Sequence, residues 1–275
     1  MGRAATVRPY TRTFFTMIIL KTDSEIDILR EGGHILSDIL KHLMGVAKPG
    51  MTTGELDRIA EKMMRDVGGE PSFKGYKVHG APPFSSSICA CLDDEVVHAP
   101  ADAYRQIRDG QLLKIDLGLR YKGLCTDMAA SVAIGKVDEK LLELSRVTRE
   151  ALLIGIGKAT EGNWISDIGK AVDKHVRRHG FTTVKDLVGH GVGKKVHEDP
   201  PVPNYHDRSI EPVKISRGLV IAIEPMVNLG EEDVYTKEDE WTIATADRTP
   251  SAHWEATIAI TAEGTEILTP IPEID

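Results

Sequence analysis

Two apolar segments, residues 111–119 and 124–134, constrain the fold of this chain more than any other feature. Alternation of buried and exposed positions over such lengths is typical of β-strands. The four residues between them, Arg-Tyr-Lys-Gly at 120–123, are typical of a hairpin connection. If the two strands pair symmetrically about this turn, Asp116 and Asp127 lie directly opposite each other. Their Cβ atoms are then roughly 4.5–5.5 Å apart.

Two opposed carboxylates in apolar surroundings repel each other and destabilise a sheet. A shared proton relieves the repulsion, and so does a bound divalent cation. On this segment alone, the alternative is a pair of solvated aspartates on an outer face of the sheet.

Three other residues with metal-ligating side chains lie in apolar or glycine-rich segments. His190 lies in Gly-His-Gly-Val-Gly, whose glycines let backbone approach an imidazole closely. Glu224 and Glu255 each interrupt an apolar strand-like run, where an unpaired carboxylate is costly. Because Pro225 follows Glu224, we expect Glu224 at a strand end, facing a cleft. Four carboxylates and one histidine predict an oxygen-rich site for two divalent ions.

The order of the predicted elements indicates an α+β fold. Helical periodicity runs from Asp23 to a stop at residues 48–50, and again over 53–67; strands follow at 87–92, 111–119 and 124–134. The same order recurs with helices at 140–159 and 165–178 and strands at 187–192, 218–227 and 252–261, with the prolines of 200–203 in a loop. We predict two pseudo-symmetric α/β halves, about 17–135 and 136–275, in a single domain.

Composition narrows the classes of partner. The chain has 34 basic and 42 acidic residues and a formal net charge of −8, which argues against a nucleic-acid partner. Three cysteines, Cys89, Cys91 and Cys125, do not make a disulfide framework, and a lone Cys-x-Cys lacks the second pair of a zinc site. We predict buried, reduced cysteines in a cytoplasmic protein. No apolar stretch approaches 18 residues, so we expect no membrane span.

The N-terminal segment 1–16 carries Arg3, Arg8 and Arg12 but no acidic residue. A secretory signal needs a longer apolar core than the one that follows it. An organelle transit peptide is one alternative. We predict a disordered or mis-assigned leader, with Met17 as an alternative start.

Several ordered motifs resemble those of the type I methionine aminopeptidases, which are metallopeptidases of the pita-bread fold. The matching segments lie between residues 17 and 273 and include DDEVVH, KIDLGL, CTDMAAS, GHGVGKKVHEDP, IEPMVN and SAHWEATIAIT. The resemblance implies a pita-bread fold with a central antiparallel sheet. It also implies an enzyme that removes the initiator methionine from nascent polypeptides and prefers small second residues.

The resemblance further implies roles for nine residues. Two divalent ions of cobalt, manganese, iron(II) or zinc would be held by five ligands: Asp116, Asp127, His190, Glu224 and Glu255. Asp127 and Glu255 would bridge the ions, Asp116 would bind one, and His190 and Glu224 the other.

The other implied roles concern the substrate. Glu224 would also act as the general base. His98 and His197 would contact the scissile amide, and Phe84 and Trp241 would line the methionine pocket, with Phe84 at a position where tyrosine is more usual.

Three positions depart from the family pattern: Asp93 and Ala99 beside His98, and Val196 beside His197. These changes bear on the pocket rather than on the reaction. Two alternatives remain: a proline-specific aminopeptidase or dipeptidase of the same fold, and a non-catalytic binding relative. The segments IEPMVN and GHGVGKKVHEDP fit the methionine branch better, and five intact ligands argue against loss of catalysis. We expect a monomer that associates transiently with the ribosome.

Overall fold

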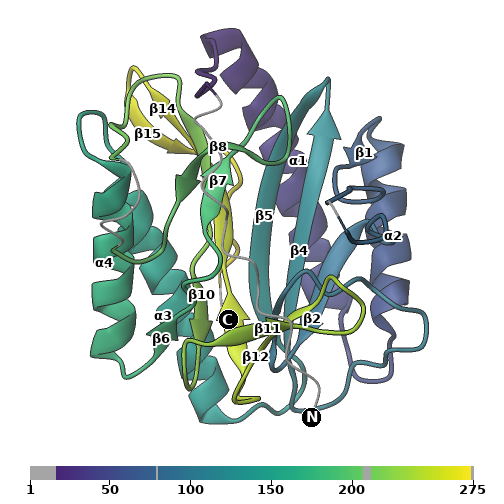
Figure 1. Ribbon diagram of the computed structural model, residues 1–275. Helices are drawn as coiled ribbons and strands as arrows, with labels where there is room; N and C mark the ends of the chain where they lie inside the picture. Colours follow the sequence, from purple (N-terminus) through teal and green to yellow (C-terminus); the bar gives the residue numbers. More distant parts are fainter. Residues whose placement is uncertain (1–16, 79, 207–211, 274–275) are drawn as a thin grey trace.

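The computed structural model describes residues 17–78, 80–206 and 212–273 (Figure 1). The leader predicted at residues 1–16 lies outside the described residues. The chain begins with helices α1 (Asp23–Val46) and α2 (Thr53–Asp66). Each begins at a threonine, Thr22 or Thr52, whose hydroxyl accepts a hydrogen bond from a backbone N–H while a glutamate three residues later closes the capping box.

The strands that follow the first two helices are β1 (Glu70–Pro71), β2 (Ile88–Leu92), β3 (Glu95–Val97), β4 (Leu112–Tyr121) and β5 (Leu124–Ala133). Two more helices come next, α3 (Glu139–Ile156) and α4 (Ile165–Arg178). The remaining strands are β6 (Thr182–Thr183), β7 (Gly189–Gly191), β8 (Glu198–Val202), β9 (Val220–Ile223), β10 (Met226–Asn228), β11 (Val234–Thr236), β12 (Ile243–Thr245), β13 (Ser251–His253), β14 (Glu255–Thr261) and β15 (Gly264–Ile267).

Within the described residues the strands form one large sheet and two small ones. The large sheet has nine strands in the order β1-β4-β5-β14-β9-β7-β8, with β2 also paired to β4 and β15 to β14. The small sheets are β13-β10-β6 and β11-β12-β3. All of these pairs are antiparallel. The predicted α+β fold with a central antiparallel sheet is confirmed.

The helices lie in two pairs beside the sheet. Helix α1 contacts β4 and β5, while α3 packs against α4 and also contacts β9 and β14. In Figure 1 the α1–α2 pair and the α3–α4 pair lie on opposite sides of the view. The predicted burial of Cys89, Cys91 and Cys125 is confirmed, and all three are free thiols. No helix in the described ranges combines the length and apolarity that a bilayer crossing requires.

The β4–β5 hairpin has a shorter turn than predicted. Tyr121 pairs with Leu124, so only Lys122 and Gly123 form the connection. Both have positive φ, 48° and 85°, as a type I′ hairpin turn requires. The four-residue connection predicted at 120–123 is therefore wrong, because Arg120 and Tyr121 pair as part of β4 and leave only two residues for the turn.

This register corrects the predicted position of the two aspartates. Asp116 pairs with Ala129, and Asp127 pairs with Gly118, so the two carboxylates are diagonal neighbours rather than directly opposite. They remain on one face of the hairpin, because a shift of two residues preserves the facing of every side chain. Diagonal neighbours are still within reach of each other.

Other predicted elements differ in detail. The strand predicted at 218–227 divides into β9 and β10 at Glu224 and Pro225, and the strand predicted at 252–261 divides into β13 and β14 at Trp254. The loop predicted for the prolines at 200–203 is wrong in part, because Pro200 and Pro201 lie in β8. Strand β8 ends the sheet path, and proline is tolerated on an edge strand because its missing N–H need not pair.

Candidate active site

A cavity of about 540 Å³ opens over one face of the large sheet, and all nine residues singled out from the sequence line it. They are Phe84, His98, Asp116, Asp127, His190, His197, Glu224, Trp241 and Glu255. The two aspartates are 7% and 2% exposed, so the alternative of solvated aspartates on an outer face is wrong.

The five carboxylate and histidine residues come from adjacent strands. Along the sheet order β4-β5-β14-β9-β7, each strand or its end contributes one of them. They are, in that order, Asp116, Asp127, Glu255, Glu224 and His190. Segments far apart in sequence therefore meet because the sheet places them side by side.

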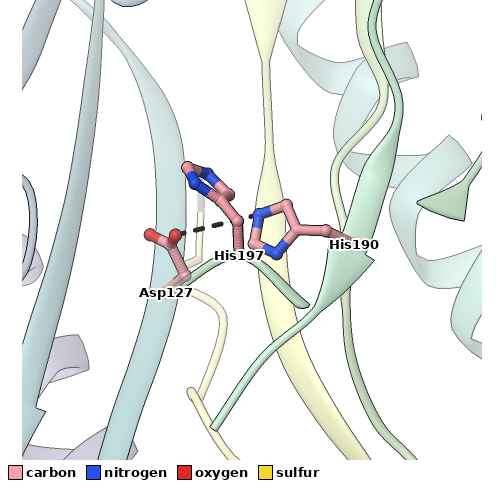
Figure 2. Close-up of side chains that lie close together, drawn as sticks. All are labelled: Asp127, His190 and His197. Atoms are coloured by element: carbon pink, nitrogen blue, oxygen red, sulfur yellow. Dashed lines mark ion pairs between the residues drawn. The ribbon is translucent and has the colours of Figure 1, made fainter. Parts of the chain in front are cut away.

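Three groups of side chains in the cavity have the spacing of metal ligands. One ligand atom from each of Asp116, Asp127 and Glu255 lies within 4.8 Å of the others, and the same holds for His190, Glu224 and Glu255. The His190 Nε2 atom is 3.4 Å from Glu224 Oε1 and 3.9 Å from Asp127 Oδ2. Asp127, His190 and His197 form the third group, and Figure 2 shows them converging from separate segments. Asp127, His190 and Glu255 each belong to two of the three groups.

Glycines bring the strand of His190 close to its neighbours. A Cβ atom on Gly189 would lie 2.5 Å from the carbonyl oxygen of Ala222, and one on Gly191 would lie 2.2 Å from that of Asp199. Both are far inside normal contact distances. The glycines on either side of His190 therefore admit the backbone of the two flanking strands, β9 and β8.

Hydrogen bonds from neighbouring side chains hold two of the carboxylate residues in place. Thr257 Oγ1 donates to the Asp127 carbonyl oxygen (2.7 Å) and accepts from the Asp127 N–H (3.0 Å). Asn204 Nδ2 donates to the Glu224 carbonyl oxygen (2.9 Å). Glu224 lies between two strands that belong to different sheets, so this contact anchors a break in the backbone ladder.

Burial shifts the acidity of the four carboxyl groups. It raises the pKa of Asp116 and of Glu224 to about 7, partly offset by His253 for the former and by His190 for the latter. Burial and the neighbouring carboxylates raise the pKa of Asp127 and of Glu255 well above the ordinary range. These groups resist ionisation together unless a cation compensates them.

The oxygen atoms of this cluster fit a bound cation. Asp116 Oδ1, Asp127 Oδ1 and Glu255 Oε1 are buried and have no hydrogen-bond partner in the described part of the chain. Buried polar atoms are ordinarily paired. Carboxylate oxygens with one imidazole suit manganese, iron(II), cobalt and zinc, so the donor set matches a divalent-metal site.

Two further histidines face this cluster. His98 has a φ of 60°, a left-handed conformation that is uncommon outside glycine and collects at functional sites. Burial, together with His253 and His190, lowers its pKa to about 4. Burial and the same kind of neighbours lower the pKa of His197 well below its usual value. Both imidazoles are neutral at pH 7 and can donate a hydrogen bond without carrying charge.

Aromatic side chains form the outer part of the cavity. The Phe84 ring is edge-on to Trp241, with centroids 5.1 Å apart, and edge-on to Phe73 at 6.4 Å. Trp241 Nε1 donates to the Pro82 carbonyl oxygen (2.8 Å), which fixes the indole. The result is a rigid apolar subsite beside the polar cluster.

Two residues of the site were missed in the sequence. Tyr76 lines the cavity, and its hydroxyl lies 2.9 Å from His197 Nδ1. His253 is fully buried with its Nε2 atom 3.5 Å from Glu224 Oε2. A signal for His253 existed, because it precedes Glu255 by two positions. Tyr76 lies in a segment without regular secondary structure, and no pattern there indicates a side chain that reaches His197.

Comparisons with known proteins agree with this geometry. The model of metallopeptidase family M24 matches residues 27–262. The methionine aminopeptidase of Clostridium perfringens is 44% identical over 253 residues, which are 92% of this chain and 99% of that protein. The crystal structure of methionine aminopeptidase from Thermotoga maritima superposes with a TM-score of 0.86 at 36% identity, covering 92% of this chain and 99% of that one. The structure of Xaa-Pro dipeptidase from Bacillus anthracis is 23% identical to this chain and superposes with a TM-score of 0.73. The match covers 94% of this chain and 63% of that one, and at this identity it shows a common fold and nothing more.

Proposed function

This chain belongs to metallopeptidase family M24, and we propose that it is a metalloaminopeptidase that removes the N-terminal methionine from polypeptides. The observation that carries the proposal is the cluster of four buried carboxylates and one histidine at the floor of a cavity with an aromatic wall. The proline-specific alternative is not favoured, because three relatives at 40–44% identity are methionine aminopeptidases.

The metal ligands of the proposal are Asp116, Asp127, His190, Glu224 and Glu255. Four carboxylates carry four negative charges when ionised, which two divalent ions neutralise, so we propose two ions per chain. When bound, such ions supply a nucleophilic water at neutral pH and polarise the scissile carbonyl. Asp127 and Glu255 would be shared between the two ions, which is supported by the presence of each of them in two of the groups with ligand spacing.

Other side chains would handle the substrate and its protons. Glu224 is the proposed base: its carboxylate lies between His190 Nε2 and His253 Nε2, at 3.4 and 3.5 Å, and a carboxylate so placed can accept and return a proton. Neutral His98 and His197 would donate hydrogen bonds to the amide carbonyl as negative charge develops on it. The Tyr76 hydroxyl would hold the His197 ring in orientation.

Selectivity for methionine would come from the aromatic subsite. Phe84, Phe73 and Trp241 present ring edges and faces to a flexible thioether, and sulfur makes favourable contacts with aromatic rings. We propose that the second residue of the substrate must be small, because the scissile bond would lie between the polar cluster and the cavity wall. We also propose that the chain is a monomer in the cytoplasm, where buried free cysteines stay reduced, and that it meets its substrates at the ribosome.

The first test is methionine release from a Met-Ala-Ser peptide by metal-stripped protein, before and after addition of manganese(II) or cobalt(II). Ala-Pro-Ser is measured in parallel. Metal-dependent release of methionine alone supports the proposal. Cleavage of the Ala-Pro bond would instead favour the proline-specific branch, and no cleavage with either metal would favour a binding protein.

A further inference from the structure

A second group of metal-ligating side chains lies on the helical layer, outside the cavity. It consists of Glu150 on α3 and His175 and His179 at the end of α4. None of these three residues is among those that line the cavity. Helices α3 and α4 pack against each other at one side of the molecule (Figure 1), and the three side chains bridge them.

The three side chains already point at a common place. One ligand atom from each lies within 4.8 Å of the others, and all three residues are half-buried. His175 Nε2 is 3.1 Å from Glu150 Oε2. The two imidazole rings have centroids 4.6 Å apart and are tilted by 54°. The histidines are four residues apart, which places them on one helix face.

A backbone hydrogen bond prepares His179 as a ligand. Its Nδ1–H donates to the carbonyl oxygen of His175 (3.0 Å), which leaves the lone pair on Nε2. Metal-ligating histidines typically donate their other ring N–H to an acceptor of this kind. The arrangement therefore sets both the tautomer and the direction of the ring.

The electrostatic surroundings are mixed but permit a cation. Glu150 Oε1 pairs with Arg146, which leaves Oε2 directed at His175. Glu143, which pairs with Lys140, is close enough to sense His179. The carboxyl end of α4 also favours positive charge at this point.

We propose that Glu150, His175 and His179 form a metal site that takes zinc, separate from the ions of the cavity. Two imidazoles and one carboxylate are a donor set that zinc prefers, with a fourth position open to water. A zinc ion here would link α3 to α4. The proposal depends only on these three residues and does not rest on the proposed function.

The test is the zinc content of the full-length protein after equilibrium dialysis at a fixed free zinc concentration. The double variant His175→Gln/His179→Gln is compared with wild type. Its matched control is His34→Gln/His42→Gln, which removes two exposed histidines from α1. We expect the first variant to hold one zinc ion fewer per chain than wild type and the control to hold the same number. Equal zinc in wild type and the first variant would overturn the proposal, as would an equal loss in both variants.

A second measurement keeps the proposal testable if the double variant folds poorly. Glu150→Gln preserves the size of the side chain and removes one charged ligand. We expect it to weaken binding of that one zinc ion by about tenfold or more, and to reduce the zinc-dependent rise in the midpoint of thermal unfolding. An unchanged affinity and an unchanged zinc-dependent midpoint in Glu150→Gln would show that the group is only a helix-packing contact.

Discussion

Binding of metal to the cavity should release protons in a number that depends on pH. In the metal-free protein, Asp127 and Glu255 have pKa values well above the ordinary range, and those of Asp116 and Glu224 are about 7. Metal ions bind the ionised carboxylates, so each protonated group must lose its proton on binding. The experiment is therefore a titration of metal-stripped protein with manganese(II) at two pH values.

The expected change in the number of released protons follows from Asp116 and Glu224, the two groups that titrate near pH 7. A carboxyl with a pKa of about 7 is roughly three-quarters protonated at pH 6.5 and roughly one-tenth protonated at pH 8. These two groups alone should therefore release about 1.3 more protons on saturation at pH 6.5 than at pH 8.

Isothermal titration calorimetry in buffers of different ionisation enthalpy counts these protons. The same shifts predict the stability of the metal-free protein. Carboxyls with raised pKa values stabilise the fold fully below pH 4, and this contribution is lost as pH rises through 7. The midpoint of thermal unfolding should therefore fall between pH 4 and 8 without metal, and less so with manganese bound. Release of less than one proton at both pH values would refute the assignment of a buried, proton-bearing carboxylate cluster.

Three substitutions test the parts that position the site. Gly191→Ala should destabilise the fold by about 1–3 kcal/mol or more in urea unfolding and weaken manganese binding, because its Cβ atom would lie 2.2 Å from a backbone carbonyl oxygen of β8; unchanged unfolding would contradict this. Lys21→Met should lower the free energy of unfolding by about 3–5 kcal/mol in the same assay, because it removes the ammonium group that lies 2.5 Å from the buried Glu198 carboxylate. An unchanged free energy of unfolding would show that the ion pair contributes little. Tyr76→Phe should lower kcat/KM for a Met-Ala-Ser peptide by about five- to tenfold with an unchanged circular dichroism spectrum, because His197 loses an orienting hydrogen bond; an unchanged kcat/KM would remove Tyr76 from the mechanism.

The sequence predicted the side chains of the site better than it predicted their arrangement. An aspartate or glutamate within an apolar run is a strong local signal, because burial of an unpaired carboxylate is costly, and Asp116, Asp127, Glu224 and Glu255 all carry it. The hairpin register could not be obtained in the same way. The register depends on whether Lys122 adopts a positive φ, as the two-residue turn requires. The two-residue and four-residue turns have similar sequence requirements, so the sequence does not choose between them.

Contacts between residues that are far apart in the sequence could not be predicted from any local sequence pattern. The approach of Tyr76 to His197 joins residues 121 positions apart, and the Thr257 hydroxyl reaches the backbone of Asp127 across 130 positions. The split of two predicted strands has a similar cause. Strands β10 and β13 leave the large sheet to pair with each other, and only the tertiary arrangement determines that choice.

The same sheet order explains how the charged metal ligands can lie in largely apolar surroundings. Each of five adjacent strands contributes one ligand, so the ligands are neighbours of one another across the sheet and not along a single strand. Without a cation, the fold must bury these carboxylates as protonated groups, which is the state that the raised pKa values describe. Ionisation of the cluster and binding of metal are therefore one event. A variant that keeps the apolar strands but replaces Asp116 by Asn should fold with little or no loss of stability in the metal-free form while losing affinity for manganese, which separates the requirements of the fold from those of the site.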